Sequence, residues 1–312
     1  MTTKAPERTT KTRERQHRSA RRKRSRWNWT LFLLFAGPNI GLILMFIYYP
    51  LIANIRFSTL NWRLGSDSAQ YIGFDNFVRF FTSDTGVEVW RVTGIFTIAT
   101  VIGSMVLGLL LAVVLNRKLP GRTVVRTAVF SPYVLSGVGV GLVWSFIFDP
   151  NLGVLGHVFR FFGQRSPEWF LDPDLALVMV IVVYIWKNLG YCAVIFLAGL
   201  QSIPDDLLEA ASIDRAGSVR RFFKVVLPLL SPTMFFILIT SILSSMQAFD
   251  VLRIMTPTGH GTNTILFEVY LQSFGAYQRA GYSAAISVVL FLVLFLITAV
   301  QIRYVERKVH YA

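Results

Sequence analysis

The chain has 312 residues, of which 54% are hydrophobic and 15% are charged, and its formal net charge at pH 7 is +14. A soluble domain seldom has this composition, so we place the chain in a membrane. Its single cysteine, Cys192, excludes an intrachain disulfide and a metal cluster built on thiolates.

Basic residues dominate the N-terminal segment 1–29, which carries eleven of the 31 lysines and arginines. A dense run such as Arg13–Arg26 is typical of segments that bind nucleic acid or anionic lipid. Because no aromatic side chains are interleaved with it, we favour a disordered anchor that lies against acidic lipid headgroups. Trp27 and Trp29 then mark the interface where this arm enters the membrane.

Six apolar stretches follow, each close to the roughly 20 residues that a helix needs to cross the hydrocarbon core. The first begins only at Leu31 and is too long for the core of a signal peptide, so we expect it to be retained. The six predicted spans are Leu31–Ala53, Val92–Leu115, Arg126–Phe148, Leu175–Leu197, Leu229–Val251 and Tyr282–Ile302. The sequence therefore predicts an all-α integral membrane fold with six transmembrane helices.

The distribution of lysine and arginine predicts the orientation, because loops rich in these residues stay cytoplasmic. Segments 1–29, 116–126, 199–228 and 303–312 carry 22 of the 31, whereas 54–91, 149–173 and 252–281 carry eight. We therefore expect a multi-pass plasma-membrane protein with both termini in the cytosol. Its domains would be a basic arm (1–29), a transmembrane domain (30–303) and a cytoplasmic tail (304–312).

Glycines in the third span and polar residues in the fourth and fifth spans stand out. Gly137, Gly139 and Gly141 indicate close packing between helices. In the fourth span, Lys187, Asn188 and Tyr191 share roughly one helical face. Ionisable groups inside a span usually face a cavity or a partner, so this face is a candidate substrate path. Alternatively, Gln247 and Asp250 on the fifth helix satisfy Lys187 and merely join the two helices.

The loop 199–228 is predicted to contain a short, well-capped helix. Ser202 can cap its free amides, and Pro204 suits a first turn. Asp205, Asp206 and Glu209 favour the positive end of the helix dipole. Ala210 and Ala211 are small, so another protein can approach closely, and Gly217 can end the helix. Pro228 suits the start of the next span. Such a stiff cytosolic helix can act as a lever between a membrane body and a soluble motor.

No catalytic motif is present in the sequence. None of its seven lysines follows a glycine, so the chain lacks the GxxxxGK[ST] loop that holds ATP phosphates. The four histidines are scattered without metal-ligand spacing, and we assign none of them to a metal. We therefore expect neither an enzyme nor a metal site.

The loop residues resemble the EAA signature of binding-protein-dependent ABC importer permeases. In that family the signature forms a coupling helix, which docks in a groove of the ATPase subunit and converts nucleotide-driven closure into opening of the pore. One position departs, because Arg215 stands where a glycine is usual. The matching residues are Glu209, Ala210, Ala211, Asp214, Gly217, Leu227 and Pro228, together with Phe222 and Phe223.

Segments 71–77, 220–224 and 299–311 are similar to the carbohydrate and glycerol-3-phosphate branch of this family. The resemblance implies a bacterial importer subunit that forms half of a path for glycerol-3-phosphate, glycerophosphodiesters or a related sugar. It also implies a second homologous permease, two ATPase subunits that bind ATP and magnesium, and an extracytoplasmic substrate-binding protein. This chain would hold no cofactor of its own, and its loop 256–264 could meet the binding protein or be an ordinary solvated connection.

Two alternatives remain open. A secondary transporter driven by an ion gradient would show inverted repeats and broken helices near the membrane midplane. An integral membrane enzyme would need acidic or histidine ligands clustered at one interface.

Overall fold

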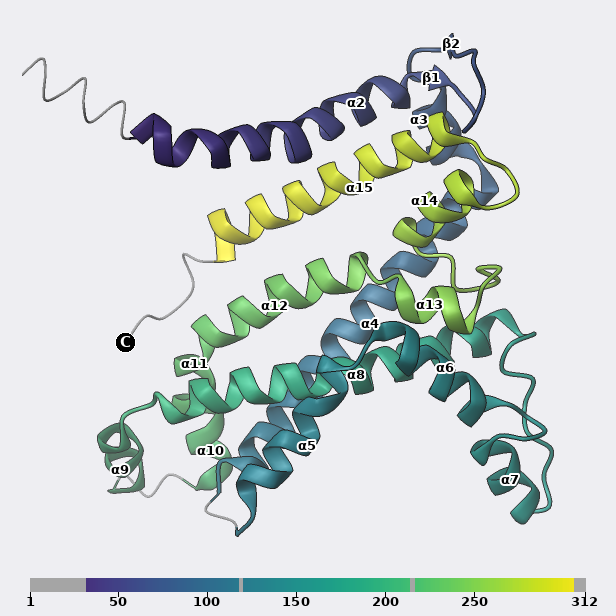
Figure 1. The fold of residues 1–312 in the computed structure, drawn as a ribbon. Coiled ribbons are helices and arrows are strands. Elements are labelled where there is room, and N and C mark those ends of the chain that lie inside the picture. Colours follow the sequence, from purple (N-terminus) through teal and green to yellow (C-terminus); the bar gives the residue numbers. More distant parts are fainter. Residues whose placement is uncertain (1–31, 118–119, 214–216, 306–312) are drawn as a thin grey trace, which may run out of the picture. The chain divides into compact units, whose positions relative to one another are not determined.

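The computed structural model describes residues 32–117, 120–213 and 217–305 (Figure 1). The basic arm 1–29, Asp214, Arg215 and the tail residues 306–312 lie outside the described residues. The chain divides into two units, residues 1–56 and 57–312, which we describe separately. Among the described residues, five helices are long and apolar enough to cross a membrane, or six if one sharply bent pair forms a single span.

The first span is a helix from Phe32 to Ser58 whose large apolar side chains are mostly exposed. It includes a π-helical turn, η1 (Leu44–Tyr48), followed by α2 (Tyr49–Ser58). The wide turn comes just before Pro50, which has no amide and whose ring would clash with the carbonyl four residues earlier in a regular α-helix. An apolar surface of this kind is stable in lipid, where it has no contact with water.

A small β-hairpin opens the second unit, with β1 (Leu60–Asn61) antiparallel to β2 (Gln70–Tyr71). Helix α3 (Asp75–Thr82) follows. The buried Asn76 side chain donates to the carbonyls of Ser58 (2.9 Å) and Leu60 (3.0 Å). These two bonds fix α3 to the chain at the start of the hairpin, which explains why position 76 carries an amide side chain.

Two long helices form the centre of this unit. Helix α4 (Asp84–Leu115) is capped by Ser83, and α8 (Pro173–Gln201) is capped by the Asp172 carboxylate, which accepts from the amides of Asp174 and Leu175. The two helices pack against each other, as Figure 1 shows. A Cβ added at Gly108 on α4 would lie 2.6 Å from the Cys192 Cβ, so glycine permits this close approach.

The third predicted span, Arg126–Phe148, is not one continuous helix. It consists of α5 (Arg122–Val134) and α6 (Gly137–Phe148), which are bent by 98°. Pro132 leaves the Ala128 carbonyl without an amide partner, and the Ser131 hydroxyl donates to that carbonyl instead (2.9 Å). The prediction was wrong because uniform hydropathy hides a break in the backbone.

Helix α7 (Val154–Phe161) lies in the loop after α6. The Asp149 carboxylate accepts from the amides of Leu152 (2.7 Å) and Asn151 (2.8 Å) and so shapes the turn between the two helices. These two bonds hold the pKa of Asp149 below its usual range.

The second half of the unit begins with short helices beyond the C-terminal end of α8: α9 (Asp205–Ile213), α10 (Ser218–Arg221), η2 (Phe222–Val226) and α11 (Leu227–Leu229). Like η1, the π-helical η2 comes just before a proline, here Pro228. Figure 1 shows α9, α10 and the start of α5 at the same end of the unit. This arrangement places the two lysine- and arginine-rich loops together.

The fifth span is α12 (Ser231–Met246) followed by α13 (Asp250–Met255), with irregular backbone at 247–249. Helix α14 (Ile265–Phe274) precedes the sixth span, α15 (Ala280–Val300), which continues into η3 (Gln301–Val305). The sequence interpretation placed Gln247 and Asp250 on one helix, but the irregular backbone separates them. Gln247 ends α12 and Asp250 starts α13.

Glycines on α6 allow α13 to pack closely against it. A Cβ at Gly141 would lie 2.8 Å from the Ile254 Cβ, and one at Gly137 would lie 2.6 Å from the Asp250 Cβ. Gly139 has nothing within 4 Å of a Cβ at its position. The packing role predicted for these three glycines therefore fits Gly137 and Gly141 but not Gly139.

Candidate functional site

A cavity of about 520 Å³ opens where α8 passes the break between α5 and α6 and the break between α12 and α13. We call it the Lys187 cavity. Three of the five residues predicted to line a substrate path, Lys187, Gln247 and Asp250, line it. The remaining polar side chains of its lining are Tyr184 and Ser244. The fold thus brings together polar groups from the fourth and fifth spans.

The Lys187 ammonium binds the backbone at the end of α5. Its Nζ donates to the carbonyl oxygens of Tyr133 and Leu135, both at 3.0 Å, and lies 5.7 Å from the centre of the Tyr133 ring. The last carbonyls of a helix have no intrahelical partner and carry partial negative charge. A cation at this position therefore stabilises the break and at the same time faces the cavity.

Asp250 lies at the opposite helix end, where α6 begins. A Cβ added to Gly137 would lie 3.0 Å from Asp250 Oδ2, so the carboxylate sits beside the first turn of α6. Negative charge is favourable at this positive end of the helix dipole. No ion pair within 4 Å joins Asp250 to Lys187. The two charges instead complement the two half-helix ends, an arrangement that neither sequence interpretation of Lys187 anticipated.

Tyr184 and Ser244 were missed by the sequence reasoning. The Tyr184 hydroxyl donates to the Ser244 carbonyl (2.7 Å) and lies 3.0 Å from the Ser244 hydroxyl, which links α8 to the end of α12. Tyr184 precedes Lys187 by three residues, so the helical period places the two on one face. That spacing was the signal that could have identified Tyr184.

Asn188 and Tyr191 do not line the Lys187 cavity. The Asn188 amide donates to the Tyr184 carbonyl of its own helix (2.8 Å). Tyr191 stacks on Tyr133 with ring centres 4.9 Å apart, and its hydroxyl donates to Thr240 (3.2 Å). Asn188 therefore contacts a residue of the cavity lining, Tyr184, whereas Tyr191 joins α8 to α5 and α12.

The predicted coupling residues lie at the other end of α8, in and after α9. Glu209 is exposed on α9, and Ala211 is partly buried. Of Ala210 only the helical backbone is described, and Asp214 lies outside the described residues. Ile203, just before α9, packs with the buried cluster that contains Leu200 and Leu230, so the chain is anchored at the point where it enters α9.

One detail of the predicted coupling loop was wrong. The Ser202 hydroxyl donates to the Gly199 carbonyl (2.8 Å) and Ser202 is the C-cap of α8, so it is not the N-cap of α9. Gly217 is the N-cap of α10, and the described part of α9 reaches Ile213. Leu227 and Pro228 lie in α11, which directly continues the π-helical turn η2.

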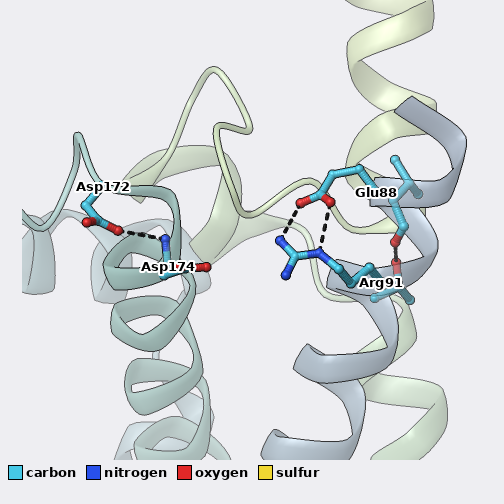
Figure 2. A network of polar contacts seen from close by, with 6 residues as sticks. Glu88, Arg91, Asp172 and Asp174 are labelled. Atoms are coloured by element: carbon cyan, nitrogen blue, oxygen red, sulfur yellow. Dashed lines mark hydrogen bonds and ion pairs between the residues drawn. The ribbon is translucent and has the colours of Figure 1, made fainter. Parts of the chain in front are cut away.

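The end of α4 opposite α9 carries exposed charges. Glu88 accepts two bonds from Arg91 (2.8 and 2.9 Å), and Figure 2 shows this pair beside the start of α8 with its Asp172 cap. The side chains of Glu88 and Arg91 are about half exposed (46% and 51%), so water screens the pair and it contributes little to stability.

The loop 256–264 packs closely against the body of this unit. Thr262 is fully buried, and its hydroxyl donates to that of Thr256 at 2.6 Å. A Cβ at Gly261 would lie 2.4 Å from the Pro173 carbonyl oxygen. This loop is therefore more than a solvated connection.

The family model and the similar sequences both describe membrane subunits of transport systems. Residues 104–311 match the family model of the binding-protein-dependent transport system inner membrane component. The chain is 35% identical over 289 residues to the sn-glycerol-3-phosphate transport system permease protein UgpA of Agrobacterium fabrum, covering 91% of this chain and 97% of that one. It is 33% identical over 280 residues to the sulfoquinovosyl glycerol transport system permease protein SmoG of the same organism, covering 89% and 91%.

A solved structure supports the fold. The chain superposes on one from a bacterial alginate ABC transporter in complex with an alginate pentasaccharide-bound periplasmic protein, with a TM-score of 0.77 and 23% identity. The match covers 89% of this chain and 94% of that one. The predicted all-α permease fold is confirmed, and the count of six spans agrees when the bent α5–α6 pair is taken as one.

Proposed function

Because the chain belongs to the family of binding-protein-dependent transport system inner membrane components, we propose that it forms half of the import path for a small polar solute and is driven through α9. The observation that carries this proposal is the Lys187 cavity, in which charges on two half-helix ends face an open volume. Broken helices whose ends line a cavity are a recurrent way to hold polar solutes within a membrane.

The solute we propose is glycerol-3-phosphate, a glycerophosphodiester or a related sugar. Lys187 supplies a cation for a phosphate or a donor for hydroxyls, and Asp250 and Gln247 supply acceptors for hydroxyl groups. The relatives named for glycerol-3-phosphate and sulfoquinovosyl glycerol transport both concern glycerol derivatives that carry an anionic group.

Work would enter this chain at α9. An exposed Glu209 on a short helix, which begins just after Ile203 has packed against a buried cluster, suits a coupling helix docked in a groove of the ATPase. In this proposal Ala210 and Ala211 form the close-packing face, and Asp214 and Gly217 shape the exit from the helix. Two separate ATPase subunits bind ATP and magnesium, and this chain does not hydrolyse ATP.

The complete importer would also contain a second homologous permease and an extracytoplasmic substrate-binding protein. Both termini, α9 and α10 would face the cytosol of a bacterial cell, because the lysine- and arginine-rich segments cluster there. The loops 149–173 and 252–281 would face outward, toward the binding protein.

The test uses the complete importer in lipid nanodiscs. Stimulation of ATP hydrolysis is compared across glycerol-3-phosphate, its diesters and several disaccharides, each presented with the binding protein. We expect the glycerol phosphates to stimulate hydrolysis by about tenfold, an ordinary magnitude for coupling between two distant sites. Stimulation by none of these solutes would contradict the substrate assignment.

One observation favours an ion-gradient transporter, namely the broken pair α5–α6. Purified chain alone in proteoliposomes with an imposed proton or sodium gradient tests this alternative. Our proposal predicts no uptake without the ATPase subunits, and uptake by the chain alone would overturn it.

A further inference from the structure

A second polar cavity, of about 590 Å³, lies at the outward end of the chain. We call it the Arg253 cavity. Its lining shares no residue with that of the Lys187 cavity, yet both receive side chains from α13. Asp250 at the start of α13 lines one, and Arg253 one helical turn later lines the other. The short helix α13 therefore connects an outer and an inner polar chamber.

Two arginines in the Arg253 cavity are held by aromatic rings and not by carboxylates. The Arg253 guanidinium carbon lies 5.2 Å from the centre of the Tyr270 ring, and that of Arg279 lies 4.7 Å from the centre of the Tyr277 ring. Among the described residues, neither arginine makes an ion pair. Stacking fixes the plane of a guanidinium and leaves its N–H edge free to bind a planar or tetrahedral anion.

The one carboxylate in the lining is engaged elsewhere. Glu268 is 2% exposed, and it accepts from the Gln272 amide (2.7 Å) and from the Asn263 amide. Among the described residues, Glu268 makes no ion pair within 4 Å with either arginine, so its recorded partners are the two amides and not the guanidiniums. The lining keeps one net positive charge from its two arginines and one glutamate.

We propose that the Arg253 cavity is an outer binding station for the anionic group of a polyol phosphate on its way to the Lys187 cavity. The phosphate binds the N–H edges of Arg253 and Arg279, which match its geometry. The Tyr270 and Tyr277 rings pack against the carbon chain of the polyol. The volume lies within the range typical of small-molecule sites. This inference rests on the proposed function, whose solute it narrows to anions.

The alternative occupant is a carboxylate of the binding protein itself. Both occupants would meet the same arginines, but they differ in what a charge-removing variant impairs. Loss of a docking contact weakens association of the binding protein. Loss of a solute station leaves docking intact and allows solute to escape during handover.

The experiment compares the wild-type importer with the double variant Arg253→Gln and Arg279→Gln, in nanodiscs and in proteoliposomes. Three quantities are measured: association of the binding protein with the nanodisc complex, ATP hydrolysis, and glycerol-3-phosphate imported per ATP hydrolysed. Arg165→Gln removes a charge from an exposed outer loop and serves as the matched control. Arg253→Lys with Arg279→Lys tests whether charge alone restores the function.

We expect the double glutamine variant to import about tenfold less solute per ATP, with association of the binding protein changed by less than about twofold. The lysine pair should recover part of the import, and the Arg165 control all of it. Weakened association with normal import per ATP would assign the arginines to the partner protein and overturn the proposal. Unchanged association of the binding protein together with unchanged import per ATP would overturn it as well.

Failure of the proposed function gives a different result. A wild-type importer that responds only to neutral disaccharides refutes the anion station while leaving the importer intact. A wild-type complex that responds to no phosphate or sugar refutes the solute assignment before any variant is compared.

Discussion

Replacing Lys187 by methionine removes the cation that binds the end of α5. Its Nζ makes two hydrogen bonds of 3.0 Å to the carbonyls of Tyr133 and Leu135. A hydrogen bond to a charged group contributes about 1.5–3 kcal/mol when it is fully buried. Since Lys187 lines an open cavity, we assign about 2 kcal/mol to the two bonds together. That energy corresponds to about a 30-fold change in the equilibrium between the bent helix pair and its alternatives.

The assay measures assembly of the importer and uptake of its solute in the same preparations. Methionine preserves most of the side-chain volume, so we expect normal assembly and uptake at least about tenfold lower. Lys187→Arg keeps the charge and should restore part of the uptake. Failed assembly would show that Lys187 mainly joins helices, and unchanged uptake would refute the role of the cavity.

Further variants test the packing and the cavity wall. Gly190→Ala places a Cβ 2.0 Å from the Val129 carbonyl oxygen and should destabilise the protein by about 3 kcal/mol, whereas Gly94→Ala meets nothing within 4 Å and should unfold at or above the wild-type temperature in detergent. Equal unfolding temperatures would contradict the close packing of α8 on α5. Tyr184→Phe loses a bond of about 1 kcal/mol and should reduce the initial uptake rate about fivefold. Asn188→Ala removes a hydrogen bond within α8 and should change uptake by less than about twofold. A larger loss of uptake would support the prediction that Asn188 lines the substrate path.

Five of the six spans could be predicted because lipid demands long apolar helices, and the residues that satisfy this demand are visible in the sequence. The break at Leu135–Ser136 was not predicted, since the apolar character of 126–148 is nearly continuous across it. Pro132 was a local signal for it, because proline removes one helix bond and clashes with the preceding turn.

The residues of the cavity could be predicted in part, but their partners could not. An ionisable residue in the middle of a span, such as Lys187, is costly enough to stand out. Its acceptors are backbone carbonyls at a helix end, which every residue possesses and which therefore leave no mark in the sequence. One of the two sequence interpretations paired Asp250 with Lys187, whereas Asp250 lies beside the first turn of α6.

The coupling loop shows the same division. The acidic first turn of α9 and its start after Pro204 follow from capping and helix-dipole rules. Serine is a common N-cap residue, yet the Ser202 hydroxyl donates to the Gly199 carbonyl at the end of the preceding helix. Two helices that lie close in sequence compete for the same capping residue, and only the three-dimensional path decides between them.

The central claim is that α9 receives mechanical work from a separate ATPase, and Ala211→Trp tests it most directly. Tryptophan at this partly buried position fills the space that a close docking contact needs. Val219→Trp, at a side chain that is 72% exposed, is the matched control. We predict that Ala211→Trp abolishes either binding of the ATPase subunits or solute-stimulated import, while the control retains both. Intact binding of the ATPase together with intact ATP-driven import in Ala211→Trp would contradict the account.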